Sequence, residues 1–207
     1  MSSYTLTNTE VIFSNGFAYP IANANSTSAQ SLITGASGKF QQPYFPGGFW
    51  QQGRTNQVAT AKFAIILATT ATPNVTITAG LNTAPNNISG STLVACNAFA
   101  TSAWSGGIVH GEVTISNFGS GYGTASVSTN LQSTISLIAN NGATTGGVVA
   151  AGGPTQLATT DFSVNQWLYL TVTFSTGSAS NTATLQQLVL RGENLSGIAS
   201  IFGHFPT

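Results

Sequence analysis

The residues best suited to chemistry stand close together in the alternating stretch 108–116. His110, Glu112 and Thr114 fall on one face of the strand expected there, because successive side chains of a strand point to opposite sides. An imidazole and a carboxylate at this spacing could bind zinc, but structural zinc sites use four ligands and catalytic sites three. The second histidine, His204, is near the end of the sequence, and no other acidic residue or cysteine clusters with the pair. We therefore expect a hydrogen-bonded surface pair and no metal ion.

Other catalytic arrangements find little support in the sequence. A hydrolase triad of Asp161, His110 and a serine would lack the Gly-x-Ser-x-Gly turn, and the glycine-rich run 118–123 lacks the spacing of phosphate-binding loops. A glycosidase needs two carboxylates about 5–9 Å apart, and only a structure decides whether Glu112 meets another one. The remaining carboxylates are those of Glu10, Asp161 and Glu193. We expect no catalytic residue and no cofactor, and hence a protein that is not an enzyme.

Charged residues are scarce throughout the chain. They make up 4% of its 207 residues, against about 25% in a typical soluble domain. The formal net charge is zero, and the basic residues stand in separate segments, so they form no patch for nucleic acid or for an anionic membrane. A protein with so little charge repulsion tends to associate. The composition therefore favours a protein that works by shape-complementary contact within an assembly.

The sequence also indicates where such an assembly would form. Cys96 is the only cysteine, which excludes an intrachain disulfide, and we expect it to be a small buried hydrophobe. The first residues carry neither the basic nor the apolar region of a secretory signal. The longest apolar stretch, 63–68, is far shorter than the roughly 20 residues that span a bilayer. We expect a protein made in a host cytoplasm and located in a virion.

Strand signals dominate the chain. Thr, Val, Ile and aromatic residues alternate between Gly, Asn and Pro turn signals, while helical spacing is almost absent. The expected strands are 4–7 with 11–14, 57–70, 74–81, 92–100, 107–117, 124–128, 133–139, 147–151, 166–174 and 182–191. We predict an all-β fold, a single jelly-roll or β-sandwich of about 8–10 antiparallel strands. Its parts are an N-terminal arm with the first strand (1–30), the sandwich (31–192) and a C-terminal arm (193–207).

The last two expected strands carry the clearest alternation. In 167–174, Leu168, Leu170, Val172 and Phe174 share one face, and a Ser-, Gly- and Asn-containing loop leads to the strand 182–191. Two strands joined by such a loop predict a hairpin. Residues 15–56, in contrast, show weak periodicity and are expected to be rich in loops.

Apolar residues outside the central strands are the candidates for subunit contacts. The aromatic run 43–50 either folds over an end of the sheet or lies against a neighbour. The tail 193–207 carries two phenylalanines, and an apolar tail either caps its own core or docks on another subunit. The interface residues that we expect are Tyr4, Leu6, Val11, Phe13, Phe49, Trp50, Ile198, Ile201, Phe202 and Phe205.

The three tryptophans keep a second kind of contact open. Trp50, Trp104 and Trp167 could stack on sugar rings, with amide and hydroxyl side chains supplying hydrogen bonds. A tryptophan in a β protein is more often part of the core or of an interface, because it buries a large area wherever it lies. Glycan binding is therefore the less favoured expectation, and it depends on which tryptophan is exposed.

Two stretches carry a resemblance to a known group of proteins. Residues 167–194, with a Trp-led strand, a Ser-Ala-Ser-Asn loop and a strand ending near Asn194, resemble the closing hairpin of small jelly-roll virion proteins of tailed phages. The run 45–50 (Phe-Pro-Gly-Gly-Phe-Trp) resembles the entry into that domain. The resemblance implies a trimeric head decoration (cement) protein on the outer capsid surface, or a tail or fibre component with the same domain.

These observations together predict a virion structural protein. The main expectation is a capsid decoration protein that forms homo-oligomers and stabilises a shell by contacts with capsid subunits, its arms laid on neighbours. One alternative is a host-recognition or carbohydrate-binding module of a tail fibre or spike. Another is a major capsid or surface-layer subunit adapted to an acidic, hot environment, where a charge-poor surface avoids the loss of paired carboxylates at low pH.

Overall fold

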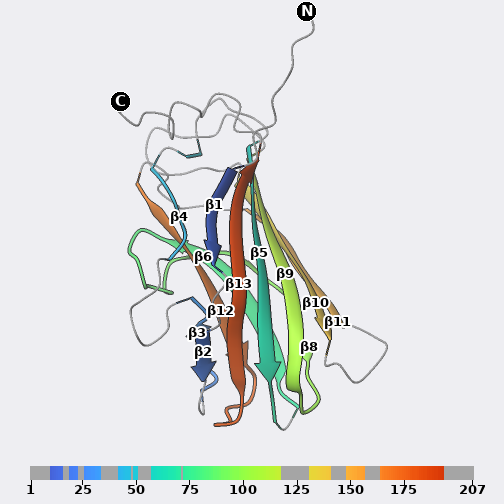
Figure 1. The fold of residues 1–207 in the computed structure, drawn as a ribbon. Helices are drawn as coiled ribbons and strands as arrows, with labels where there is room; N and C mark the ends of the chain where they lie inside the picture. Colours follow the sequence, from blue (N-terminus) through green and yellow to red (C-terminus); the bar gives the residue numbers. More distant parts are fainter. Residues whose placement is uncertain are drawn as a thin grey trace, which may run out of the picture.

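The chain folds into two antiparallel β-sheets packed face to face, as the computed structural model shows (Figure 1). The structure describes residues 10–15, 19–22, 26–33, 42–47, 49–50, 57–70, 72–117, 131–140, 148–156 and 164–193. These residues contain no helix, and thus none long and apolar enough to cross a membrane. The predicted all-β sandwich is confirmed.

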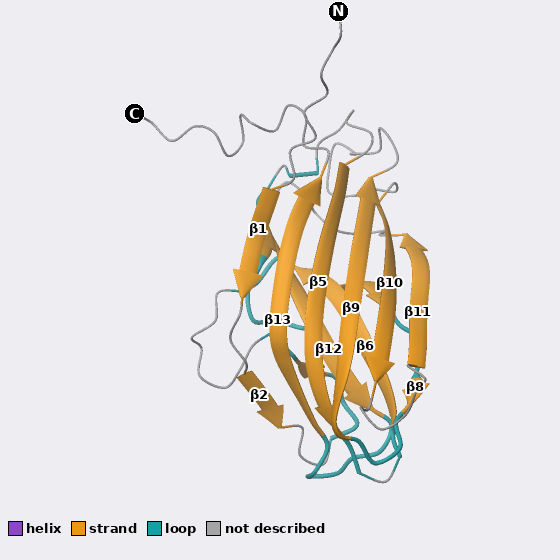
Figure 2. Ribbon diagram, turned by 45° about the vertical axis from the view of Figure 1, so that its right-hand side comes forward, coloured by secondary structure: helices purple, strands orange, loops and turns teal. Residues whose placement is uncertain are grey.

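The first layer is a seven-stranded sheet, seen side by side in Figure 2. Its strands run in the order β1, β13, β5, β9, β10, β11, and β2 pairs with the other end of β13. Their bounds are β1 Glu10–Asn15, β2 Tyr19–Ala22, β5 Gln57–Ala68, β9 Ser105–Asn117, β10 Leu131–Asn140, β11 Val148–Gln156 and β13 Thr182–Glu193.

The second layer is a six-stranded sheet with the order β3, β12, β6, β7. Two short strands complete it, β4 beside β12 and β8 beside β6. Their bounds are β3 Gln30–Ser31, β4 Tyr44–Phe45, β6 Asn74–Asn82, β7 Ser91–Ala95, β8 Phe99–Ala100 and β12 Gln166–Phe174.

Strict alternation places the core between the two layers. In β5 every second residue from Ala59 to Leu67 is buried, and in β12 the face from Leu168 to Phe174 is fully buried. Cys96 is also buried, as expected, and burial raises the pKa of its thiol. Because the side-chain period of a strand is two, burying these residues turns their neighbours outward and fixes both outer faces.

Most of the expected strands are present. The expected strand 92–100 divides into β7 and β8, because residues 96–98 turn between them, while 4–7 and 124–128 lie outside the described residues. Three short strands within the supposedly loop-rich region, β2, β3 and β4, were not expected. They carry little alternation of their own and form by adding to the longer strands β12 and β13.

The predicted hairpin of 167–174 and 182–191 is wrong. β12 pairs with β6 in one sheet and β13 pairs with β5 in the other, so the loop between them crosses from layer to layer. Polar bonds hold this crossing: the Ser175 hydroxyl accepts from the Asn74 amide at 2.9 Å, and the Asn181 side chain accepts from the Thr70 amide at 2.9 Å. Alternation specifies a buried face but not the neighbouring strand.

The expected arms are described only where they join the sheets. Within 1–30, β1 and β2 pair with β13 of the same chain, while residues 1–9 lie outside the described part. The same is true of the C-terminal arm beyond Glu193. The proposed laying of the arms on neighbouring subunits remains a prediction.

A candidate binding site on the seven-stranded sheet

His110 and Glu112 lie on the outer face of β9, as the alternation predicts. The residue between them, Gly111, faces inward, where the ring of Phe63 from β5 covers it. A β-carbon at this position would lie 2.1 Å from that ring, so only glycine permits the approach. The close packing of β5 on β9 brings their outward side chains into one row.

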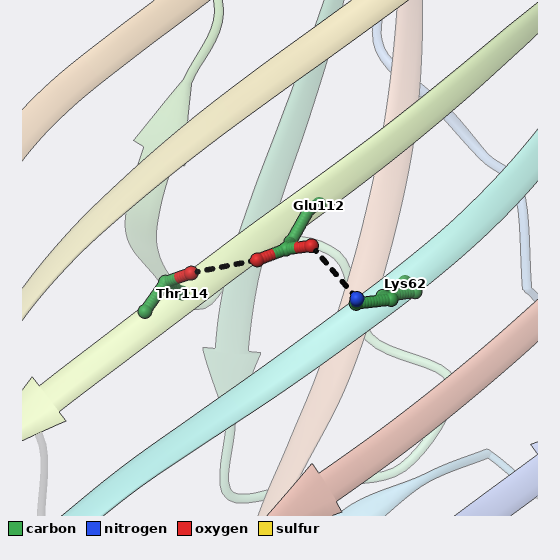
Figure 3. Close-up of polar contacts among 3 residues, drawn as sticks. All are labelled: Lys62, Glu112 and Thr114. Carbon is green, nitrogen blue, oxygen red and sulfur yellow. Dashed lines mark hydrogen bonds and ion pairs between the residues drawn. The ribbon is translucent and has the colours of Figure 1, made fainter.

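Lys62 and Glu112 are direct partners in that row. The lysine Nζ lies 3.2 Å from Glu112 Oε2, and the Thr114 hydroxyl donates to Glu112 Oε1 at 3.4 Å (Figure 3). Lys62 is 59% exposed and Glu112 41%, so water screens the pair. Such a pair stabilises the fold by about 1 kcal/mol at most, and its presence therefore points to a role other than stability.

A hollow of about 410 Å³ surrounds this pair and extends over β13, β5, β9 and β10. Its polar lining comes from the ion pair and from four further side chains, and its apolar lining includes Ile138 and Val189. The four further polar residues are His110, Ser136, Gln187 and Arg191. All the charged side chains that the structure describes therefore gather in one place.

This gathering was not predicted, because the charges are far apart in sequence. Lys62, Glu112 and Arg191 belong to three strands, and the pairing that unites them runs from β13 through β5 to β9. The only available signal was that each alternates with buried neighbours and so points outward. Their meeting depends on long-range register, which local patterns do not contain.

The arrangement suits binding better than acid–base or metal chemistry. Among the described residues, no three His, Cys, Asp or Glu side chains lie close enough to hold a metal ion. The one described carboxylate of the hollow, Glu112, already faces Lys62. The side chains of Glu10, Asp161 and Glu193, the possible second carboxylates, lie outside the described part.

Three exposed isoleucines extend the same face beyond the hollow. Ile66 and Ile108 lie directly opposite each other on β5 and β9, and Ile138 of β10 lies opposite His110. They are 37%, 45% and 61% exposed, respectively. Exposed apolar side chains beside polar ones are typical of contact surfaces.

The aromatic pair that we expected at an interface lies in the core instead. Phe49 and Trp50 are 0% and 1% exposed and pack on each other and on Phe45, with ring centroids 4.8–5.5 Å apart. A turn, in which the Phe49 amide donates to the Pro46 carbonyl at 3.0 Å, folds the run inward. These two residues offer no surface to a neighbour, which corrects the expectation for them.

The other expected interface residues are not described in detail. Val11 and Phe13 belong to β1, but the structure does not describe their side chains. The remaining six lie outside the described part of the chain: Tyr4, Leu6, Ile198, Ile201, Phe202 and Phe205. Their proposed role in docking remains a prediction.

The tryptophans separate clearly by exposure. Trp50 and Trp104 are 1% and 5% exposed, whereas Trp167 of β12 is half-buried. Trp167 contacts the half-buried Tyr44 of β4, with ring centroids 4.7 Å apart. Of the three, Trp167 is thus the one available for stacking on a ligand, and it lies on the sheet opposite the hollow.

The outer face of that six-stranded sheet is otherwise closed. The ring of Tyr169 lies across Gly80 of β6, where a β-carbon would come within 2.0 Å of it. Its hydroxyl donates to the Gly90 carbonyl at 3.2 Å, and burial raises the pKa of Tyr169.

Comparisons with known proteins give distant structural matches. No family model and no curated protein matches the sequence. The CBM2 module of the evolved Dit protein of Lactobacillus casei BL23 phage J-1 is 12% identical, with a TM-score of 0.36, covering 91% of this chain and 97% of that one. Peanut lectin with a bound nine-residue peptide is 10% identical, with a TM-score of 0.37, covering 92% and 98%. At these scores, neither match bears on what this chain binds.

Proposed function

We propose that this chain is a non-enzymatic recognition module of a virion that binds a saccharide in the hollow of the seven-stranded sheet. The observation that carries the proposal is the gathering of Lys62, Glu112 and Arg191, with His110, around one hollow on an otherwise charge-poor molecule. Their placement on the outer face follows from strand pairing alone, and the exposed ion pair contributes little to stability.

The size and chemistry of the hollow favour a small polyhydroxylated ligand. A volume of about 410 Å³ lies within the range of small-molecule sites. Hydroxyl, amide, imidazole and guanidinium groups offer both donors and acceptors, while Ile138 and Val189 offer apolar contact. A sugar has the matching pattern of hydroxyl groups around apolar C–H faces. The strands hold these groups in place, which lowers the entropic cost of binding.

Binding, rather than cleavage, agrees with the described groups. Hydrolysis of a glycoside uses two carboxylates, one of them protonated. In the described part of the hollow, Glu112 is the one carboxylate, and the cation of Lys62 at 3.2 Å favours its charged form. The virion setting is supported by the composition and by the resemblance of residues 167–194.

A glycan array followed by titration of the best ligand tests this function. Gln187 lines the hollow, whereas Gln132 is exposed on the same sheet outside it. We expect Gln187→Ala to weaken binding about fivefold or more, since a hydrogen bond contributes about 1 kcal/mol. Gln132→Ala is the matched control and should bind like the unchanged protein. An array without any bound glycan, or equal effects of both variants, contradicts the proposal.

Capsid decoration is the second candidate, favoured by the isoleucines Ile66, Ile108 and Ile138. Their exposure on one face fits a protein partner such as a capsid subunit or a second copy of the chain. Co-sedimentation with virus particles tests it: Ile108→Glu should abolish binding to the particle, whereas Thr173→Glu, on the opposite sheet, should not. Unimpaired decoration by Ile108→Glu would exclude this face as the contact.

A further inference from the structure

We infer that the saccharide bound in the hollow is acidic, with a carboxylate that contacts Arg191. The inference rests on the proposed function and names its ligand class. It starts from the charges in the described lining: two cations, Lys62 and Arg191, face one anion, Glu112. The lining therefore carries one formal positive charge in excess.

The two cations are not equivalent. Lys62 is engaged by Glu112 at 3.2 Å, whereas Arg191 has no ion pair among the side chains that the structure describes. Pairing places Arg191 opposite Thr60 of β5, two residues from Lys62, so that the guanidinium belongs to the rim of the hollow. Five fixed N–H donors fit a carboxylate with two parallel hydrogen bonds.

The lining also argues against a neutral sugar as the preferred ligand. Neutral sugars gain much of their affinity by stacking on an exposed aromatic ring, yet the aromatic residue of the described lining, Phe63, is 3% exposed. The half-buried Trp167 lies on the other sheet. Charged hydrogen bonds are thus the strongest interaction that the hollow offers, and they select a negative group.

The test compares methyl glucuronide with methyl glucoside, which differ only in a carboxylate replacing a hydroxymethyl group. We expect the glucuronide to bind at least about tenfold more tightly, as one charge-assisted hydrogen bond suffices for this ratio. The preference should shrink with added salt, because the groups are exposed. Arg191→Gln should make the two affinities equal, while Arg191→Lys should keep part of the preference.

Further arms separate the other sources of such a result. Glu193 follows two residues after Arg191 and its side chain lies outside the described part, so Glu193→Gln should bind the glucuronide at least as tightly as the unchanged chain. Acetate should bind far more weakly than the glucuronide. Equal binding of acetate would make the hollow a site for small anions and would overturn the inference.

The outcomes distinguish this inference from the function on which it rests. If both sugars bind equally and Gln187→Ala weakens both, the hollow binds saccharides without selecting acidic ones, and the inference alone fails. If an unchanged preference persists in Arg191→Gln, the assignment to Arg191 is wrong. If neither sugar binds and the array is blank, both the inference and the proposed function fail.

Discussion

The two outer faces of the sandwich differ in what covers them. On the six-stranded sheet, Tyr169 lies flat across Gly80 and binds the Gly90 carbonyl, so part of that face is internal packing. On the seven-stranded sheet, the corresponding outward positions carry charged groups around an open hollow. One face therefore contributes to stability and the other is free to bind. The comparison predicts that substitutions on the two sides have opposite effects on folding and on recognition.

The largest loss of stability is expected within the core. Trp50→Ala removes a fully buried indole from its contacts with Phe45 and Phe49 and should lower the free energy of unfolding by about 3–5 kcal/mol. The half-buried Trp167→Ala is the matched control and should cost less than half as much. Urea denaturation at two protein concentrations measures both. A Trp50→Ala protein with unchanged stability but impaired association would restore the interface role.

A smaller effect is expected on the closed face. Gly80→Ala places a methyl group against the Tyr169 ring and should cost about 1–3 kcal/mol of unfolding free energy. In a Tyr169→Ala background the same substitution should cost far less, because the obstructing ring is gone. A double-mutant cycle by thermal or urea unfolding gives this coupling. Strictly additive losses would show that the ring and the glycine do not constrain each other.

The smallest effect on stability is expected on the open face. Lys62→Gln and Glu112→Gln should each change the free energy of unfolding by about 1 kcal/mol or less, because both groups are exposed. Their effects on methyl glucuronide binding should nevertheless be opposite, weaker for Lys62→Gln and tighter for Glu112→Gln. Calorimetry and urea unfolding of the same samples separate the two. Equal signs for binding would place the ligand away from the ion pair.

Local patterns predicted the sandwich well, because burial on one face imposes a period of two. They identified the long strands of both sheets and the outward position of His110 and Glu112. They did not identify the partner of a strand. The supposed hairpin of β12 and β13 spans two sheets, since an alternating strand can pair with any neighbour that buries the same face.

The candidate site was beyond the sequence for the same reason. Lys62, Glu112 and Arg191 appeared scattered, and only the register of three strands brings them together. The aromatic run 45–50 shows the reverse case, in which residues adjacent in sequence suggested a surface but a turn buries them. Clusters formed by long-range pairing cannot be found from local spacing, whereas the scarcity of charge could have marked each charged residue as informative.

One measurement tests the central claim that the open face is the recognition site. Titration of isotopically labelled protein with methyl glucuronide, followed by amide chemical shifts, compares both faces in a single sample. The account predicts shifts confined to the middle of β13, β5, β9 and β10, centred on Arg191, Lys62 and Glu112. Shifts centred on Trp167 and Tyr44, or none at ligand concentrations that saturate weak sites, would contradict it.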